Sequence, residues 1–134
     1  MVYYQKNFNK YGAKSTIYND KSYHSKFEAS YAQWLDVCLK NGDIKGWDGQ
    51  VKLDLKVNGT HITNYYIDFV VYHLDGTRDF VECKGFATAE WQLKWKIFEA
   101  TFDDFKENPD DKMIVIKQSN WGIPKKQLQW KTRA

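Results

Sequence analysis

Three ionisable residues have the types that metal-dependent hydrolysis needs. Asp68 is followed fourteen residues later by Glu82, and then by Lys84. Both segments have the pattern of strands joined by a tight turn, so all three side chains can reach one edge of a sheet. Carboxylates on stiff strands suit a hard divalent cation such as Mg²⁺, with Mn²⁺ as a substitute. A neighbouring lysine can hold a phosphate or orient a metal-polarised water. The combination is typical of phosphodiester hydrolysis.

The register of the two strands decides whether the acids share a face. A two-residue turn would place Asp68 opposite Cys83 and send Glu82 to the other face. A three-residue loop, Leu74-Asp75-Gly76 with a left-handed glycine, places Asp68 opposite Glu82. We predict the second register, in which Lys84 joins the two acids. The other face then forms an apolar back for the helices, made by Ile67, Phe69, Val71, Val81 and Cys83.

The elements around these residues follow from periodicity and turn signals. A helix begins after Ser25, which forms a capping box with Glu28, and ends at Asn41-Gly42. Asn58-Gly59 predicts a tight hairpin. Simple pairing from this hairpin would bring residues 51–57 to the face of the acids, so an irregularity before Asp68 is expected. The other predicted elements are a turn at 19–22 between two short extended pieces, a loop through Gly46, Trp47 and Gly49, strands over 51–57, about 60–72, 79–84 and 113–117, and a helix from Thr88 to before Asn108-Pro109.

Length and composition bound the class of protein. A chain of 134 residues that is 43% hydrophobic and 28% charged fits one globular domain over 1–134. Aromatic residues make up 17% of the chain, which fits either core packing or surface stacking on bases. Cys38 and Cys83 lack metal-ligand spacing, and we expect them to be reduced thiols of a cytoplasmic protein. We find no signal peptide and no apolar run that could cross a membrane.

Positive charge gathers at the two ends. Residues 1–26 hold five lysines and one acid, and residues 117–134 hold five basic residues and no acid, whereas the middle is net acidic. Basic extensions over 1–24 and 119–134 would suit phosphate contacts, although solvated termini explain them equally well. The candidate DNA contacts are Lys10, Lys14, Lys26, Lys94, Lys96, Gln50, Lys125 and Lys126.

Two interpretations of the acids remain open from the residues alone. Glu82-x-Lys84 could be an ordinary cross-strand ion pair. Asp68, however, interrupts the most apolar stretch of the chain, where an unpaired charge is costly, so a bound cation is favoured. Glu28 could join the acids from the first helix, or could serve only as part of its capping box.

Four segments together resemble the PD-(D/E)XK nuclease superfamily, and within it a family of small phage and prophage nuclease-like proteins. The segments are Asn9–Lys14, Ser25–Ala29, Tyr66–Phe69 and Glu82–Phe86, and the match extends from about Asn9 to Phe102. Ile67 stands where the superfamily motif has proline, a position at which replacement is common.

The resemblance implies a restriction-endonuclease-like αβββαβ core, with a mixed central sheet flanked by helices, in a single α/β (α+β) domain. It implies a Mg²⁺-dependent DNA endonuclease that acts on branched DNA such as Holliday junctions, works as a homodimer and resides in the bacterial cytoplasm. Carried over by position, Asp68, Glu82, the carbonyl of Cys83 and Glu28 would ligate the metal, and Lys84 would position water or phosphate. The alternatives are a nonspecific or sequence-specific nuclease, and a non-catalytic DNA-binding subunit that kept the fold.

Overall fold

The computed structural model describes residues 2–8, 14–18, 21–23 and 25–118, with side chains from residue 25 onward. The contacts divide the chain into two compact units, Met1–Asp43 and Ile44–Ala134. The single domain expected over 1–134 stays a prediction.

The first unit contains three short strands and a helix. β1 (Val2–Phe8), β2 (Lys14–Tyr18) and β3 (Lys21–Tyr23) form an antiparallel sheet in that order. The predicted extended pieces around residues 19–22 correspond to β2 and β3, whereas β1 was not predicted, because residues 2–8 lack a sustained alternation of apolar and polar side chains. The helix α1 (Lys26–Lys40) begins after Ser25, whose hydroxyl accepts the Glu28 backbone N–H at 3.2 Å. The predicted start and end of this helix are confirmed.

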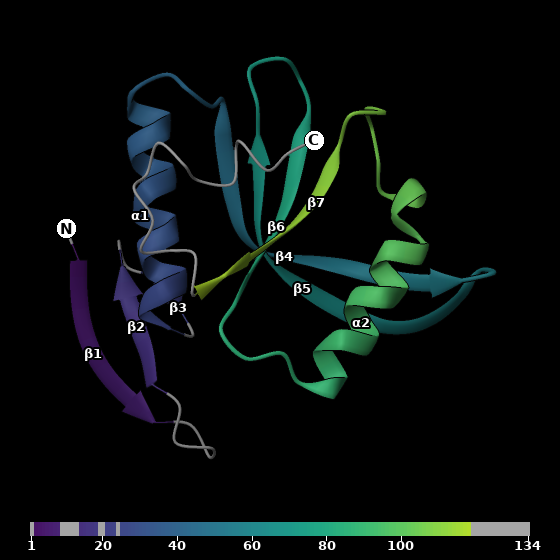
Figure 1. Ribbon diagram of the computed structural model, residues 1–134, viewed down its shortest axis with the longest axis horizontal. Helices are drawn as coiled ribbons and strands as arrows, with labels where there is room; N and C mark the ends of the chain where they lie inside the picture. Colours follow the sequence, from purple (N-terminus) through teal and green to yellow (C-terminus); the bar gives the residue numbers. More distant parts are fainter. Residues whose placement is uncertain (1, 9–13, 19–20, 24, 119–134) are drawn as a thin grey trace. The chain divides into compact units, whose positions relative to one another are not determined.

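The second unit contains a four-stranded mixed sheet in the order β4 (Gly46–Val57), β5 (Thr60–Tyr72), β6 (Arg78–Lys84) and β7 (Lys112–Lys117). β4, β5 and β6 are antiparallel neighbours, whereas β7 runs parallel to β6. The connection between β6 and β7 contains the helix α2 (Ala89–Ala100) and the short 3₁₀ turn η1 (Phe102–Asp104), as Figure 1 shows. The predicted α+β class with a mixed sheet and two helices is confirmed.

Along the described chain, no helix combines the length and the apolar character needed to cross a bilayer.

The two predicted hairpin turns form as expected. Asn58 and Gly59 both have positive φ angles, 50° and 80°, which is the backbone of a tight two-residue hairpin. Gly76 has a φ of 90°, and the His73 backbone N–H donates to the Thr77 carbonyl at 2.9 Å. The pairs from Phe69–Val81 to Tyr72–Arg78 fix the register predicted for the three-residue loop. Continued by one pair, this register brings Asp68 opposite Glu82.

Two predicted boundaries are wrong. The expected loop through Gly46, Trp47 and Gly49 is the first part of β4, which pairs with β5 from Gly46–Tyr72 onward. The second helix ends at Ala100 rather than before Asn108. Thr101 caps it, with its hydroxyl donating to the Ile97 carbonyl at 2.8 Å, and the chain then tightens into η1. The apolar spacing of the sequence continues across this change, because η1 still turns Phe102 and then Phe105 toward the core.

The β4–β5 pairing is irregular at two places. The register shifts between Leu55, which pairs with Thr63, and Lys56, which pairs with His61, and a second irregularity lies directly beside Asp68. Gln50 has a φ of 52°, and the β4–β5 pairing passes over the position that Gln50 and Asp68 would occupy. The side chains that face the core also change at this position. Strict alternation would place Ile67 and Val70 on opposite faces of the sheet, yet both pack in the same buried cluster as Phe80. A positive φ at a non-glycine residue therefore marks the point where the strand changes its inward face.

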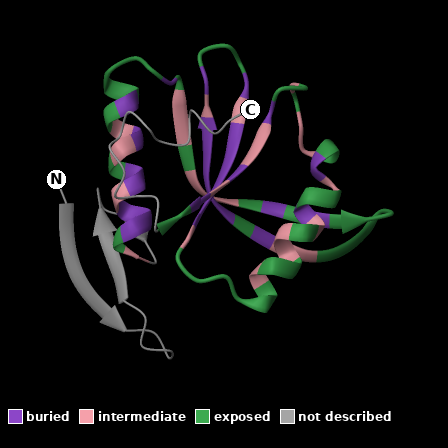
Figure 2. Cartoon of the chain, viewed as in Figure 1, coloured by how far each residue is buried: buried purple, intermediate pink, exposed green. Residues whose placement is uncertain are grey.

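α2 covers the face of the sheet that carries Phe80 and Glu82. Phe98 of α2 lies within 5.4–5.8 Å, centroid to centroid, of five rings, those of Tyr65, Phe80, Trp95, Phe102 and Phe105. The expectation that the helices pack only on the opposite, apolar face is therefore wrong for α2. In this unit the aromatic excess of the sequence is largely core packing, and Figure 2 shows the buried residues concentrated along the sheet.

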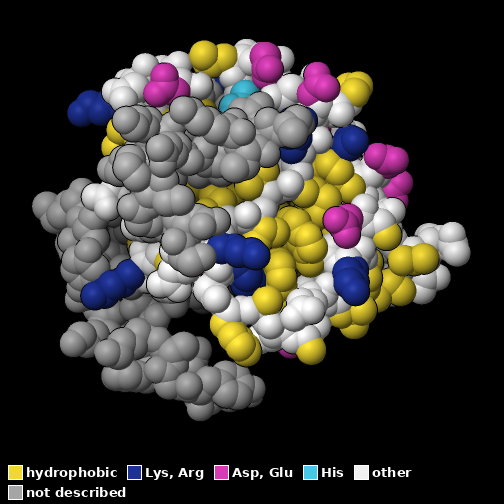
Figure 3. Space-filling view, in the orientation of Figure 1, with side chains coloured by type: hydrophobic (Ala, Val, Ile, Leu, Met, Phe, Trp, Pro, Cys, Tyr) yellow, Lys and Arg dark blue, Asp and Glu magenta, His cyan; other side chains and the backbone are white. Residues whose placement is uncertain are grey.

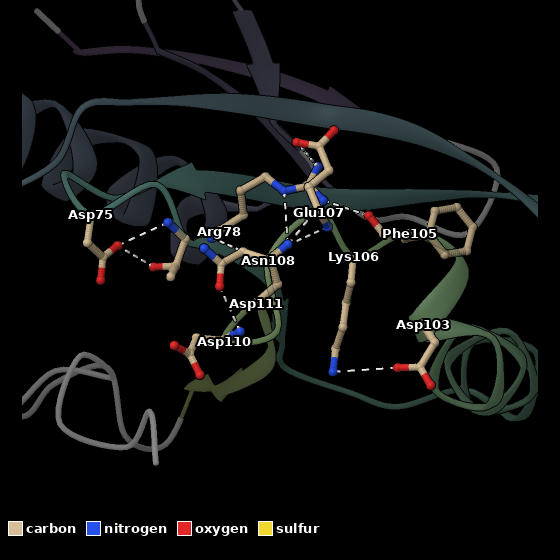
Figure 4. Close-up of polar contacts among 10 residues, drawn as sticks. Asp75, Arg78, Asp103, Phe105, Lys106, Glu107, Asn108, Asp110 and Asp111 are labelled. Carbon is tan, nitrogen blue, oxygen red and sulfur yellow. Dashed lines mark hydrogen bonds and ion pairs between the residues drawn. The ribbon is translucent and has the colours of Figure 1, made fainter.

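The sheet end at which β6 begins is held by one buried carboxylate (Figure 4). Asp111 accepts the backbone N–H groups of Arg78, Glu107 and Asn108 at 2.8, 2.9 and 3.1 Å, and its Oδ2 forms an ion pair with the Arg78 guanidinium at 3.2 Å. Burial alone would raise the pKa of Asp111, but these donors hold the pKa below its usual value. These contacts of Asp111 fix the start of β6 beside β7. They thereby also fix the register that places Glu82 and Lys84 at the other end of β6.

Phe98→Ala should lower the free energy of unfolding by about 3–5 kcal/mol, because the helix would leave a cavity among five rings. Leu93→Ala, on the exposed side of the same helix, should change it by less than about 0.5 kcal/mol. Urea denaturation of both variants measures the contrast, and similar losses for the two would contradict this core.

Candidate active site

The two predicted acids come together where β5 and β6 lie side by side. Asp68 and Glu82 are both buried, with 5% and 4% of their surfaces exposed. Asp68 Oδ2 accepts the Cys83 backbone N–H at 2.9 Å, and Gln50 donates to Asp68 Oδ1 at 3.4 Å. The Asp68 carboxylate is thus hydrogen-bonded to the strand that bears Glu82. Gln50, predicted as a DNA contact, donates to Asp68, and its contact with DNA stays a prediction.

Glu82 has a partner at each carboxylate oxygen. The Tyr65 hydroxyl donates to Oε1 at 2.7 Å, and the Lys84 ammonium lies 3.2 Å from Oε2. Burial, and next the charge of Asp68, raise the pKa of Glu82 to about 7, although Tyr65 and Lys84 act in the opposite direction. The two carboxylates are therefore close together with little solvent around them, and added positive charge would stabilise this site.

Tyr65 and Trp91 support this pair, and neither was among the residues singled out from the sequence. Trp91 Nε1 donates to the Tyr65 hydroxyl at 3.1 Å, so the hydroxyl is oriented to donate to Glu82. Burial, followed by the Glu82 charge, raises the pKa of Tyr65 far above its usual value, so the hydroxyl keeps its proton. A tyrosine two residues before Ile67 in a predicted strand, with a hydroxyl that needs a partner when buried, was the signal available in the sequence.

Lys84 is positioned by a ring as well as by an acid. Its ammonium lies 4.6 Å from the centroid of the Trp91 ring, and Trp91 in turn stacks on Trp95 with centroids 5.5 Å apart. The lysine thus sits between a carboxylate and an aromatic face, which restricts its direction without removing its charge. All three predicted residues of the motif, Asp68, Glu82 and Lys84, are brought together as the register required.

The donors present fit a hard divalent cation in part. Asp68 and Glu82 offer carboxylate oxygens, and the backbone carbonyl of Cys83 directly follows Glu82 in the chain. Across the described ranges, no group of three or more His, Cys, Asp or Glu side chains is arranged to hold a metal ion. Glu28 is buried in α1 of the first unit, where Ser25 caps its backbone N–H. Its role as a further metal ligand stays a prediction.

The predicted DNA contacts are spread over several elements. Lys96 is exposed on α2, and Lys94 lies one turn from Glu90, with 3.4 Å between the ammonium and the carboxylate. Lys26 is exposed at the start of α1. Lys14 lies in β2, where only the backbone is described, and Lys10, Lys125 and Lys126 fall outside the described residues. None of these assignments to DNA is tested by the geometry.

Glu82→Gln should change how stability depends on pH. The pKa of Glu82 is raised from 4.5 to about 7, so the stability gained from its protonated form is complete below pH 4.5 and is lost as the pH rises through 7. The variant keeps a neutral side chain and does not lose this stability. The difference in free energy of unfolding, variant minus wild type, should therefore rise by about 3 kcal/mol between pH 4 and pH 8.

Urea denaturation across this pH range measures the difference. Glu90→Gln, at an exposed carboxylate, is the matched control, and its difference from the wild type should stay within about 0.5 kcal/mol throughout. A constant difference between the wild type and Glu82→Gln would show that Glu82 titrates as an ordinary carboxylate.

Comparison with known proteins adds one finding. Neither the curated proteins nor the solved structures contain a match to this chain. One family model matches residues 8–117, a range that includes Asp68, Glu82 and Lys84 together with α1, α2 and the four-stranded sheet. Because the match covers most of the sequence, the chain belongs to the family described as "Protein of unknown function (DUF1064)".

Proposed function

We propose that this protein is a Mg²⁺-dependent DNA endonuclease. The observation that carries the proposal is the convergence of two buried carboxylates, Asp68 and Glu82, with the Lys84 ammonium 3.2 Å from one of them. Burying two acids side by side is costly unless a cation shares the site, and an oxygen-rich site of this kind suits Mg²⁺ or Mn²⁺. The family model names no activity, so the proposal rests on the geometry and on the resemblance to PD-(D/E)XK nucleases, with their restriction-endonuclease-like fold.

Each residue of the site would have a separate role in binding the metal or the phosphate. Asp68, Glu82 and the carbonyl of Cys83 would hold the cation, with Glu28 as a further ligand. When bound, the metal would supply an activated water and a positive charge beside the phosphate. Lys84 would bind a phosphate oxygen and stabilise the charge that develops there in the transition state. To bind the phosphate, the Lys84 ammonium must leave the Glu82 oxygen. The Trp91 ring would keep the ammonium near its present position during this change of partner.

DNA is proposed as the substrate because of the basic residues that the sequence predicts as phosphate contacts. Lys94 and Lys96 on α2 would contact the backbone on either side of the cleaved bond, and Lys10, Lys14, Lys26, Lys125 and Lys126 would extend the contact. We further propose branched DNA as the preferred form, cut by a homodimer in the cytoplasm of a bacterium that carries phage or prophage genes. A nonspecific or sequence-specific nuclease would use the same chemistry.

A non-catalytic DNA-binding subunit is the second candidate. It is favoured by one observation, that both Glu82 oxygens already have partners in Tyr65 and Lys84, an arrangement that satisfies the acid without a metal. In that case Mg²⁺ would leave the stability of the chain unchanged. A metal-binding protein would instead be stabilised according to the metal concentration.

Asp68→Asn should abolish cleavage of labelled four-way and linear DNA in Mg²⁺ while leaving DNA binding in EDTA within about twofold of the wild type, because the change removes a proposed metal ligand and leaves the basic surface intact. Denaturing gels report the cutting and fluorescence anisotropy reports the binding. The wild type should cut in Mg²⁺ and not in EDTA. Cleavage retained by Asp68→Asn would overturn the assignment, and binding without cleavage by the wild type in every metal would favour the second candidate.

Tyr65→Phe should raise the Mg²⁺ concentration needed for half-maximal cleavage by about 10–100-fold, because Glu82 loses the donor that orients it. The maximal rate should recover largely at saturating Mg²⁺, since the lost hydroxyl is not itself a proposed ligand. Tyr66→Phe, the exposed neighbour on the same strand, is the matched control and should behave as the wild type. An equal effect of the two variants would place Tyr65 outside the site.

A further inference from the structure

A pocket adjoins the proposed active site on the side of Lys84. Its volume is about 260 Å³, and it opens where β6 and β7 end and α2 begins. Trp91, Ala87 and Val115 form its apolar wall, and two lysines, Lys84 and Lys117, also line it. In Figure 3, apolar side chains lie exposed between basic ones over the part of the surface where α2 lies. None of the roles proposed above for the acids uses this space.

The size and the lining together limit what can bind there. Pockets for drug-sized ligands enclose roughly 300–1,000 Å³, so this one suits a single small group. An apolar wall favours a flat or aliphatic group, whereas two lysines favour an anion beside it. A nucleotide has both parts, a flat base and a phosphate, and Lys84 already belongs to the residues proposed to bind phosphate.

The loop between β6 and α2 adds an exposed ring at the same place. Phe86 is 81% exposed, and its two neighbours in the sequence, Gly85 and Ala87, both line the pocket. Gly85 lies beside the Gln118 side chain, since a Cβ atom at Gly85 would lie 2.7 Å from Gln118 Oε1. The exposed Phe86 ring thus belongs to a loop whose neighbouring residues line the pocket.

Exposed apolar rings on DNA-binding proteins can insert between bases and separate them. A base displaced in this way needs a surface on which to pack, and aromatic or apolar walls provide it at a gain of binding free energy for each base. Phe86 and the pocket are separated by no more than one residue along the chain. The two features together therefore match an unpaired nucleotide next to a base pair.

We propose that the pocket beside Lys84 binds one unpaired nucleotide of a DNA strand, with its base against Ala87, Trp91 and Val115, its phosphate at Lys117, and the Phe86 ring against the adjacent base pair. The inference rests on the proposed function in taking DNA as the substrate. The inference goes beyond the proposed function because it states which feature of the DNA is recognised. That feature is an unpaired base, rather than a particular sequence or a branch as such.

The test measures binding in EDTA, so that it is independent of cleavage. The full chain is titrated into three short labelled duplexes: a fully paired one, one with a single unpaired 2-aminopurine, and one with an abasic residue at that position. The wild type should bind the unpaired base about tenfold more tightly than the paired duplex, with a change in 2-aminopurine emission, and should show little preference for the abasic duplex.

Two variants and two controls separate the proposal from simpler explanations. Phe86→Ala removes the ring and Ala87→Leu fills the pocket, and each should reduce the preference to near unity. Leu93→Ala, at another exposed apolar residue, and Lys52→Gln, at a distant exposed lysine, should keep the tenfold preference. Preference retained by both pocket variants, or equal preference for the abasic duplex, would overturn the proposal.

The oligomeric state is measured on the same proteins by light scattering. If Phe86→Ala turns a dimer into a monomer, the ring is covered by a second copy of the chain and the proposal fails. The proposed nuclease function fails or holds separately: cleavage without a preference for the unpaired base refutes only this inference, and preference without cleavage refutes only the nuclease.

Discussion

The placement of two carboxylates side by side in the interior of the second unit is the constraint on which its other features depend. Both acids are buried, and burial, followed by the charge of Asp68, raises the pKa of Glu82 to about 7. Hydrogen bonds and an ion pair from neighbouring residues offset the free-energy cost of burying the two acids. The Cys83 backbone and Gln50 donate to Asp68, and Tyr65 and Lys84 satisfy Glu82. A fold that keeps such a pair against its own stability is one in which the pair has a use.

The sheet positions this pair by controlling register at three places. The left-handed Gly76 sets a three-residue loop, and the loop brings Asp68 opposite Glu82. The positive φ at Gln50 changes the inward face of the chain beside Asp68, so that the apolar residues of the β4–β5 hairpin and those of β6 can share one core. Asp111 fixes the far end of β6 against β7. A slip of one residue at any of these points would separate the acids.

The sequence predicts the parts of this arrangement that depend on local rules. Turn chemistry at Asn58-Gly59 and Gly76, capping at Ser25 and alternation in the strands gave the order of elements and the register of the acids. What it did not give depends on tertiary packing. The helix α2 packs on the face of the acids because Phe98 fits among five rings, and the partnership of Tyr65 with Trp91 joins residues 26 positions apart. The position of the strand irregularity at Gln50 likewise has no local signal, because glutamine is an unusual residue for a positive φ.

We propose that Asp68 and Glu82 together bind a divalent cation. Anomalous diffraction from crystals of the protein soaked in Mn²⁺ tests this directly. We expect a manganese peak within coordinating distance of both carboxylates, with the Lys84 ammonium displaced from Glu82. A clear map with no peak between the two acids, at a Mn²⁺ concentration that supports DNA cleavage, would contradict it.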